Sequence, residues 1–471
     1  MIPWQRLILI GCVLLFLPFS GWSEELSVEA TRAGALADLK LLIDTAKSAW
    51  AYAEDKKENF GVDLDQLSAS AAARIGTCTN KAEAFEILRG VVSGMRDGHA
   101  SLRQRDAGPS APAGRIKGQI REVREGLVLD KELILRWKGR PVEEALAPLI
   151  ARAFASTPGM ARRLAIEKLP YGQLGQTIRV TLKGTNGVEE ERELRYEPDS
   201  EPEPPPLELK WPEKGIAYLA LRTFDVRRSA WQVKQDGPAN ASGLPAAAVE
   251  GVQAKISEAF SQCADAKALI LDLRGNGGGS DSIGIHVALH LLSGEFAYFK
   301  LQTRFSPEVK KLPGFENGPD NGWSVLDSGW KPPRPAGLEA FPGGVWVLQD
   351  ELCFSTTDNL LACLRDLLPA ERGRFLGQPS GGGSGAPRPL VTLPFTGAQL
   401  TLTVMEVYSP SGRLIEGRGT QPNRQIIWTW DDVVRGTDPV LKAALEEATK
   451  RGPSYLRPDN RRSQSKPAPI L

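Results

Sequence analysis

The chain of 471 residues has little of several things that often reveal function: three histidines, five cysteines and a net charge of only +1. So small a charge excludes a field that would attract nucleic acid or an anionic membrane, and neither is an expected partner. His286 and His290 lie one helical turn apart, but no carboxylate–histidine motif accompanies them. We therefore expect them at packing or surface positions, and we expect no metal site and no cofactor.

The N-terminus differs from the rest of the chain. Apolar residues run from 7 to 19 after Arg6, and a break with the small residues Gly21 and Ser23 precedes two glutamates. This order is typical of a secretory signal peptide, residues 1–23, and the apolar run is short for a membrane span. Cys12, in the sequence LIGC, also fits a lipoprotein cleavage box, which is the less favoured alternative. We expect an exported protein, periplasmic or secreted, with no stable membrane insertion after the signal is removed.

Export would leave four cysteines, which are Cys78, Cys263, Cys353 and Cys363. An oxidising compartment permits disulfides, but four cysteines allow three pairings and their spacing selects none. Cys353 and Cys363 are expected to be small buried apolar residues.

Composition and periodicity divide the chain. A helical pattern predicts an N-terminal domain at 24–105, and a mixed region with short strands and a helix follows at 115–200. Three consecutive prolines, residues 204–206, mark a boundary because proline fits neither a helix interior nor a central strand. The tail at 451–471, rich in Pro, Ser, Arg and Lys, is expected to be disordered.

Beyond the prolines, apolar strands alternate with helices, which predicts an α/β core at 207–450. The strands are expected at 216–221, 268–273 and 345–348, and the helices at 246–260, 283–292 and 359–368.

Residues 267–280 read KALILDLRGNGGGS, in which a buried strand ends in three consecutive glycines. Glycines at the end of a strand allow positive φ and leave N–H groups unshielded. Such a turn can hold an oxyanion, although a phosphate cradle and an ordinary tight turn have the same look. Asp272, Arg274 and Asn276 are expected to brace the turn.

Three further stretches accompany the glycines: MRDGH at 95–99, VWVLQDELCFSTTD at 345–358 and YSPSGRLIEGRG at 408–419. In this order the four motifs resemble those of the tail-specific (C-terminal-processing) serine protease family, including its tricorn-like branch. The resemblance covers residues 28–450. It implies a multidomain α/β fold, with an N-terminal helical domain, a PDZ-like α+β module at 115–200 and a crotonase-like α/β protease core. A small α+β spacer is the alternative for 115–200.

Ser355 matches the nucleophile of this family. It falls in a turn from strand to helix, where a serine oxygen is exposed and helix N–H groups favour negative charge. The alternative is a structural role, because Ser355 and Asp358 also fit the S/T-x-x-D capping box of a helix start. Both roles are compatible.

The resemblance also bears on the base. Many family members use a lysine at the position of Gly383, so the usual Ser–Lys dyad is excluded there. His99 matches the histidine of the tricorn-like branch, and an imidazole of pKa near 6.5 accepts a serine proton at neutral pH. A lone histidine is more often structural, which is the alternative.

Glu416 falls where that branch places a catalytic glutamate, which would orient His99. Its alternative is an exposed charge between glycines. Tricorn-like enzymes relay through a serine directly before the histidine, and that position is Gly98. Either Glu416 contacts His99 directly, or Ser101 or Asp97 substitutes.

For the oxyanion hole, the resemblance implies the N–H groups of Gly278 and Thr356. Together these residues predict an exported serine endopeptidase acting on proteins or peptides. Two alternatives remain: a non-catalytic carrier of apolar ligands on the same fold, and a peptide-binding scaffold. A short distance from His99 to Ser355 discriminates the protease from both.

Overall fold

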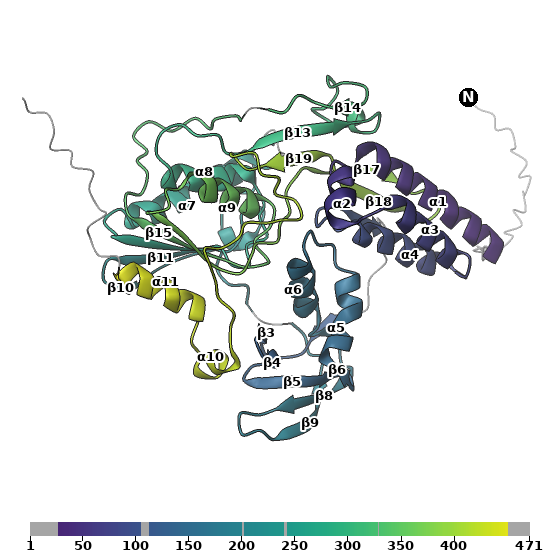
Figure 1. The fold of residues 1–471 in the computed structure, drawn as a ribbon, viewed down its shortest axis with the longest axis horizontal. Helices are drawn as coiled ribbons and strands as arrows, with labels where there is room; N and C mark the ends of the chain where they lie inside the picture. The colour runs from purple at the N-terminus through teal and green to yellow at the C-terminus, as the bar shows by residue number, and fades with distance from the viewer. Residues whose placement is uncertain (1–26, 105–112, 200–201, 240–242, 328, 451–471) are drawn as a thin grey trace, which may run out of the picture.

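The computed structural model describes residues 27–104, 113–199, 202–239, 243–327 and 329–450. The predicted signal peptide, the tail at 451–471 and residues 105–112, where the sequence rich in Pro, Gly and Ala predicts a linker at 106–114, lie outside these ranges. The described part has the predicted class, a multidomain α/β structure with helices and several separate sheets (Figure 1). Within these ranges no helix combines the length and the apolar character needed to cross a bilayer.

Four helices form the N-terminal part: α1 (Val28–Ala49), α2 (Ala53–Phe60), α3 (Leu64–Ile75) and α4 (Lys81–Gly94). The side chains of Ser27, Asp63 and Asn80 accept hydrogen bonds from amides in the first turns of α1, α3 and α4, which fixes where these helices begin.

The helices share one hydrophobic core with a small antiparallel sheet of order β1-β18-β17. Its strands are β1 (Ser101–Gln104), β18 (Ala398–Thr403) and β17 (Pro387–Thr392). The sequence division placed residues 387–403 with the α/β core, but Leu400 and Leu402 are buried among the helices. Pairing with β1 places this hairpin against the N-terminal helices. Local periodicity does not predict such a long-range contact.

Residues 113–199 form a separate α+β module (Figure 1). Its sheet is antiparallel, in the order β3 (Ile120–Val123), β4 (Gly126–Leu129), β5 (Glu132–Trp137), β8 (Thr177–Lys183) and β9 (Glu189–Arg195), with β6 (Arg140–Pro141) paired to β5. Two helices, α5 (Val142–Ala151) and α6 (Pro158–Lys168), complete it, and β2 (Ala113–Arg115) pairs with β7 (Tyr171–Gln173).

The α/β core is built on a six-stranded sheet, parallel except at its first edge. The strand order is β10 (Leu207–Glu213), β11 (Ile216–Leu221), β12 (Ala268–Asp272), β15 (Gly344–Gln349), β16 (Gly373–Gly377) and β20 (Arg424–Gln425). Strands β11, β12 and β15 are those predicted from the apolar runs.

Both faces of this sheet are covered, which is why its strands are apolar without alternation. Residues such as Leu219 and Leu271 face α7 (Ala246–Gln262), α8 (Asp281–Leu291) and α9 (Thr356–Leu367). Their sequence neighbours face α11 (Pro439–Lys450) on the other side (Figure 1). The carboxyl ends of β12 and β15 therefore lie side by side, and each leads into a predicted motif.

The remaining elements join the parts. Strands β13 (Lys300–Phe305), β14 (Gly322–Trp323) and β19 (Met405–Tyr408) form a further, three-stranded sheet. The helix α10 (Trp430–Arg435) precedes α11, and short 3-10 turns lie at Ser229–Trp231 and Val309–Lys311. Arg304 of β13 donates to the carbonyl of Trp50 at 3.0 Å, which ties this sheet to the N-terminal helices.

The four cysteines of the described residues are buried and unpaired. His286 and His290 both approach Ser257 Oγ, with Nε2 at 2.8 and 3.1 Å, and His290 stacks on Phe260. Burial lowers the pKa of both histidines.

Candidate active site

Ser355 lies between the end of β15 and the start of α9. Its backbone has φ 59° and ψ −126°, a left-handed conformation that typically costs a non-glycine residue about 1–3 kcal/mol. The Ser355 amide donates to the carbonyl of Gly383 at 2.9 Å, which helps to hold this turn. The side chain makes no capping bond to α9. The capping alternative is therefore not realised by the side chain of Ser355.

The imidazole of His99 faces this hydroxyl, with Nε2 3.0 Å from Ser355 Oγ. Its ring stacks on Phe354, the residue before Ser355, with centroids 4.5 Å apart. Asp97 shapes the main chain here, since Oδ1 accepts from the amides of His99 and Ala100 and Oδ2 accepts from Trp50 Nε1. Burial lowers the pKa of His99, and the charge of Asp97 opposes that shift. The ring is therefore biased toward the neutral form, which can accept a proton.

Glu416 is fully buried beside this pair. Its carboxylate, His99 and Asp97 each offer an atom within 4.8 Å of the other two. His99 Nδ1 is buried and makes no hydrogen bond to any described residue, so it is the ring nitrogen that remains for a carboxylate partner. The expectation of an exposed charge between glycines does not hold, because Glu416 has no exposed surface. Burial raises the pKa of Glu416 to about 8, and Lys56 opposes the shift.

Lys56 of α2 is a residue that the sequence analysis missed. Its side chain is fully buried, and Nζ lies 2.8 Å from Glu416 Oε1. The ammonium also donates to the carbonyls of Arg96 and Ser156 and lies 5.0 Å from the Phe60 ring centroid. A buried ammonium with carboxylate and carbonyl partners has its donors satisfied. No local signal marks it, since α2 reads AEDKKENF, like an exposed charged helix.

Ser156 is a second missed residue. Its hydroxyl accepts from the amide of Gly98 at 3.0 Å, and its effect on Glu416 is to lower the pKa of that carboxyl. A Cβ at position 98 would lie 2.6 Å from the Phe354 ring, so a serine there has no room. Ser101, one candidate substitute, lies in β1 and pairs with Thr401. A hydroxyl therefore reaches this region from residue 156, not from the position before the histidine.

The predicted oxyanion donors lie against Ser355. A Cβ on Gly278, which has φ 89°, would be 2.6 Å from the Phe354 carbonyl oxygen and 2.8 Å from Ser355 Cβ, so only glycine fits. The Gly278 amide donates to Asn276 Oδ1 at 2.9 Å. The Thr356 amide, at the first position of α9, has no hydrogen-bond partner among the described residues. Thr356 is thus the freer donor, while Gly278 would share its N–H between two acceptors.

The loop that holds Gly383 explains why no lysine stands there. A Cβ at position 383 would lie 1.7 Å from the Phe354 ring, which stacks on His99. Asp358 holds the loop by accepting from Ser380 Oγ and from the Gly383 amide, and burial raises the pKa of Asp358 to about 7. The space that a side chain at 383 would need is occupied by the aromatic support of His99.

We therefore expect Gly383→Ala to displace Phe354 and, with it, His99. Overpacking of this kind costs about 1–3 kcal/mol of unfolding free energy. Activity should fall by about 10² because a misplacement of about 1 Å can have that effect. Thermal unfolding and kcat/KM test this. The control is Gly90→Ala, whose Cβ would meet its nearest neighbour at 3.5 Å. Full activity in Gly383→Ala would contradict the role given to Phe354.

Comparison with known proteins adds a family and a fold. Residues 215–426 match the profile of peptidase family S41. No curated protein sequence matches the chain. The crystal structure of mature CPAF is similar to 90% of this chain and 99% of its own, with a TM-score of 0.67 at 17% identity. Mature CPAF complexed with lactacystin gives a TM-score of 0.64 at 19% identity, over 89% of this chain and 97% of its own.

Proposed function

Because the chain belongs to peptidase family S41 and is a serine peptidase, we propose that it is an exported endopeptidase with Ser355 as nucleophile and His99 as base. Membership of this family implies protein or peptide substrates. The observation that carries the proposal is the 3.0 Å separation of His99 Nε2 from Ser355 Oγ, which is within proton-transfer reach.

In the first half of the reaction, Ser355 Oγ attacks the scissile carbonyl while its proton passes to His99 Nε2. The tetrahedral oxyanion accepts hydrogen bonds from the amides of Thr356 and Gly278. His99 then gives the proton to the leaving amine. In the second half a water molecule repeats the sequence on the acyl-enzyme, with the same histidine as base and then acid.

Glu416 is the group that orients His99 and stabilises the imidazolium. The open Nδ1 of the histidine and the proximity of the carboxylate support this role. Lys56 acts through Glu416 and is a positioning residue, since its ammonium contacts the carboxylate and not His99. The alternative that the sequence left open, a non-catalytic carrier of apolar ligands, is excluded because the chain is a serine peptidase.

The test is proteolysis of unfolded casein by the mature chain, residues 24–471, beside Ser355→Ala. Wild-type protein should produce fragments and the variant none. Equal cleavage by the two proteins, each purified through the same steps, would mean that another residue is the nucleophile. Export is tested separately, by the mass of the protein recovered from the periplasm or medium of an expressing bacterium, where cleavage after residue 23 is expected.

The raised pKa of Glu416 gives this mechanism a predicted pH dependence. The reactive form needs neutral His99 and ionised Glu416. Because the pKa of His99 is lowered, the part of the pH–activity profile that reports loss of its proton lies below pH 6.5. Glu416, in contrast, ionises near pH 8. The profile of kcat/KM should therefore rise through about pH 8 and reach a plateau above it. Glu416→Gln should remove this limb. A single limb near pH 6.5, unchanged in the variant, would contradict the assignment.

A further inference from the structure

A cavity of about 580 Å³ lies between the module at 113–199 and the carboxyl ends of the core strands. Open α/β sheets bind ligands at this edge. The walls come from β3, α6 and the segments that follow β11, β12, β15 and β16. Five arginines line the cavity: Arg121, Arg162, Arg163, Arg222 and Arg274.

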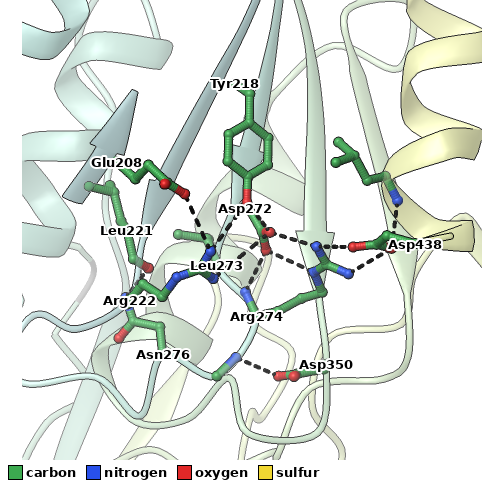
Figure 2. A network of polar contacts seen from close by, with 12 residues as sticks. Glu208, Tyr218, Leu221, Arg222, Asp272, Leu273, Arg274, Asn276, Asp350 and Asp438 are labelled. Carbon is green, nitrogen blue, oxygen red and sulfur yellow. Dashed lines mark hydrogen bonds and ion pairs between the residues drawn. The ribbon is translucent and has the colours of Figure 1, made fainter. Parts of the chain in front are cut away.

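Three of these arginines already have close carboxylate partners. Arg162 pairs with Glu122 and Glu143, and Arg163 pairs with Glu167 at 2.9 Å. Figure 2 shows Arg274 held between Asp272 and Asp438, each within 2.8 Å. The charges of these three arginines are therefore neutralised within the protein. Arg121 and Arg222 are the two arginines of the cavity that remain.

Arg222 is only loosely paired. Its guanidinium nitrogens are 4.0 Å from both Glu208 and Asp272, beyond hydrogen-bond distance, and one of them donates to the Tyr218 hydroxyl at 3.3 Å (Figure 2). The side chain is 30% exposed. Arg222 therefore has donors to spare for a group that enters the cavity.

Arg121 has no partner of opposite charge. Its guanidinium stacks on the Trp428 ring at 3.9 Å from the centroid, and it makes no ion pair or side-chain hydrogen bond with any described residue. Burial and the like charges of Arg163 and Arg274 lower the pKa of Arg121. The charges of Asp438 and Glu167 oppose this shift, but each of these carboxylates is already paired with another arginine. A half-buried cation facing other cations is costly unless an anion joins it. The arrangement is that of a site whose anion comes from outside the chain.

The acidic residues of the cavity do not supply that anion. Glu122 and Asp438 hold other arginines, and Asp350 accepts from the amides of Gly275 and Leu352. Glu351 remains, and burial raises its pKa to about 7. Much of its charge is therefore removed at neutral pH, which reduces its repulsion of a bound anion.

The cavity is within reach of a peptide held at Ser355. Glu351 lines it and stands four residues before Ser355, so their Cα atoms are at most about 14 Å apart. Gly275, also in the lining, stands three residues before Gly278. An extended peptide advances about 3.3 Å per residue, so a residue about three to five positions from the scissile bond can enter the cavity.

We propose that this cavity binds a carboxylate of the substrate peptide through the guanidinium groups of Arg121 and Arg222. The planar fork of arginine matches a carboxylate and gives charge-assisted hydrogen bonds. The carboxylate is that of an aspartate or glutamate side chain of the peptide. This inference rests on the proposed function, since it assigns a specificity subsite to the same peptidase.

The first arm of the test uses two synthetic peptide libraries with randomised interiors, one amidated at the C-terminus and one with a free carboxylate. Products are sequenced by mass spectrometry. Enrichment of Asp and Glu at one position, about three to five residues from the cut in both libraries, identifies an acidic side chain. Cleavage at that distance from the end in the free-acid library alone, without this enrichment, would show that the terminal carboxylate is bound instead. Enrichment supports the site, and cleavage without enrichment overturns it.

The second arm uses variants on a peptide chosen from the first. Arg121→Gln should lower kcat/KM for the acidic peptide by about 10- to 100-fold, mainly through KM, because a charged hydrogen bond is lost. The matched peptide with Asn or Gln in place of the acidic residue should be cleaved as by wild type, which also shows that the variant folds. Arg124→Gln, an exposed neighbour outside the cavity, should change neither. A preference that survives Arg121→Gln overturns the inference.

A binding arm separates this inference from the proposed function. The libraries are passed over immobilised Ser355→Ala protein and over Ser355→Ala/Arg121→Gln protein, and retained peptides are sequenced. Carboxylate-bearing peptides should be retained by the first protein and not by the second. If wild-type protein cleaves nothing but this difference is seen, the proposed function fails and the carboxylate site stands. Equal retention overturns the site whatever the cleavage result.

Discussion

Ser355→Ala and His99→Ala are each expected to lower kcat/KM by about 10⁴- to 10⁶-fold, and the double variant should lose no more than either one. The reason is that the two residues act as a unit: a serine without its base is a poor nucleophile, and a base without its serine has no proton to take. The hydrogen bond of 3.0 Å between His99 Nε2 and Ser355 Oγ is the contact that couples them.

Kinetics of the three variants on one cleaved peptide measure this coupling, because independent contributions would multiply. The double variant would then be slower than each single variant by the product of the two effects. Phe354→Leu is a useful companion, because it keeps both reacting groups and removes the ring that stacks on His99. A partial loss is expected there. Loss in Ser355→Ala together with full activity in His99→Ala would remove the histidine from the mechanism.

Lys56→Met is expected to destabilise the protein by about 3–5 kcal/mol and to lower kcat/KM at neutral pH by about 10- to 100-fold. Removing the ammonium leaves the buried carboxylate of Glu416 without its ion pair, which is the costly way to break such a pair. The pKa of that carboxylate is already raised by burial, and it should rise further once Lys56 no longer opposes the shift. Glu416 would then be protonated at pH values where it now orients His99.

The double variant Lys56→Met/Glu416→Gln separates stability from catalysis. It removes the stranded charge, so most of the lost unfolding free energy should return, whereas activity should not. The pH limb near 8 should move to higher pH in Lys56→Met and be absent from the double variant. Lys57→Met is the matched control, since Lys57 is the next residue of the same helix and is exposed. An unshifted pH profile in stable Lys56→Met would show that Lys56 has only a structural role.

Much of the candidate site could be found from sequence because it is carried by local motifs. Ser355 follows an apolar strand, and the glycines that include Gly278 follow another, so the parallel sheet brings the two ends together. His99 was found through the resemblance, in a short loop after a helix. What these residues share is that their immediate neighbours in the chain create the turns that expose them.

Lys56, Ser156 and the Phe354–Gly383 contact could not be found in this way. Lys56 has the sequence surroundings of an exposed residue and is buried only because the loop of Glu416, about 360 residues later, folds over it. The hairpin of β17 and β18 packs on the N-terminal helices for a similar reason, since its partner strand β1 is about 300 residues away. Such contacts depend on tertiary packing, which the periodicity of a segment does not encode.

The most direct test of the central claim is fluorophosphonate labelling of the purified mature protein, with the modified residue identified by peptide mass mapping. We predict one adduct per chain on Ser355, no adduct in Ser355→Ala, and labelling slowed by at least about 10³-fold in folded His99→Ala, because the serine then lacks its base. An adduct on another residue, or labelling at the wild-type rate in His99→Ala, would contradict the assignment of Ser355 and His99 as an activated pair.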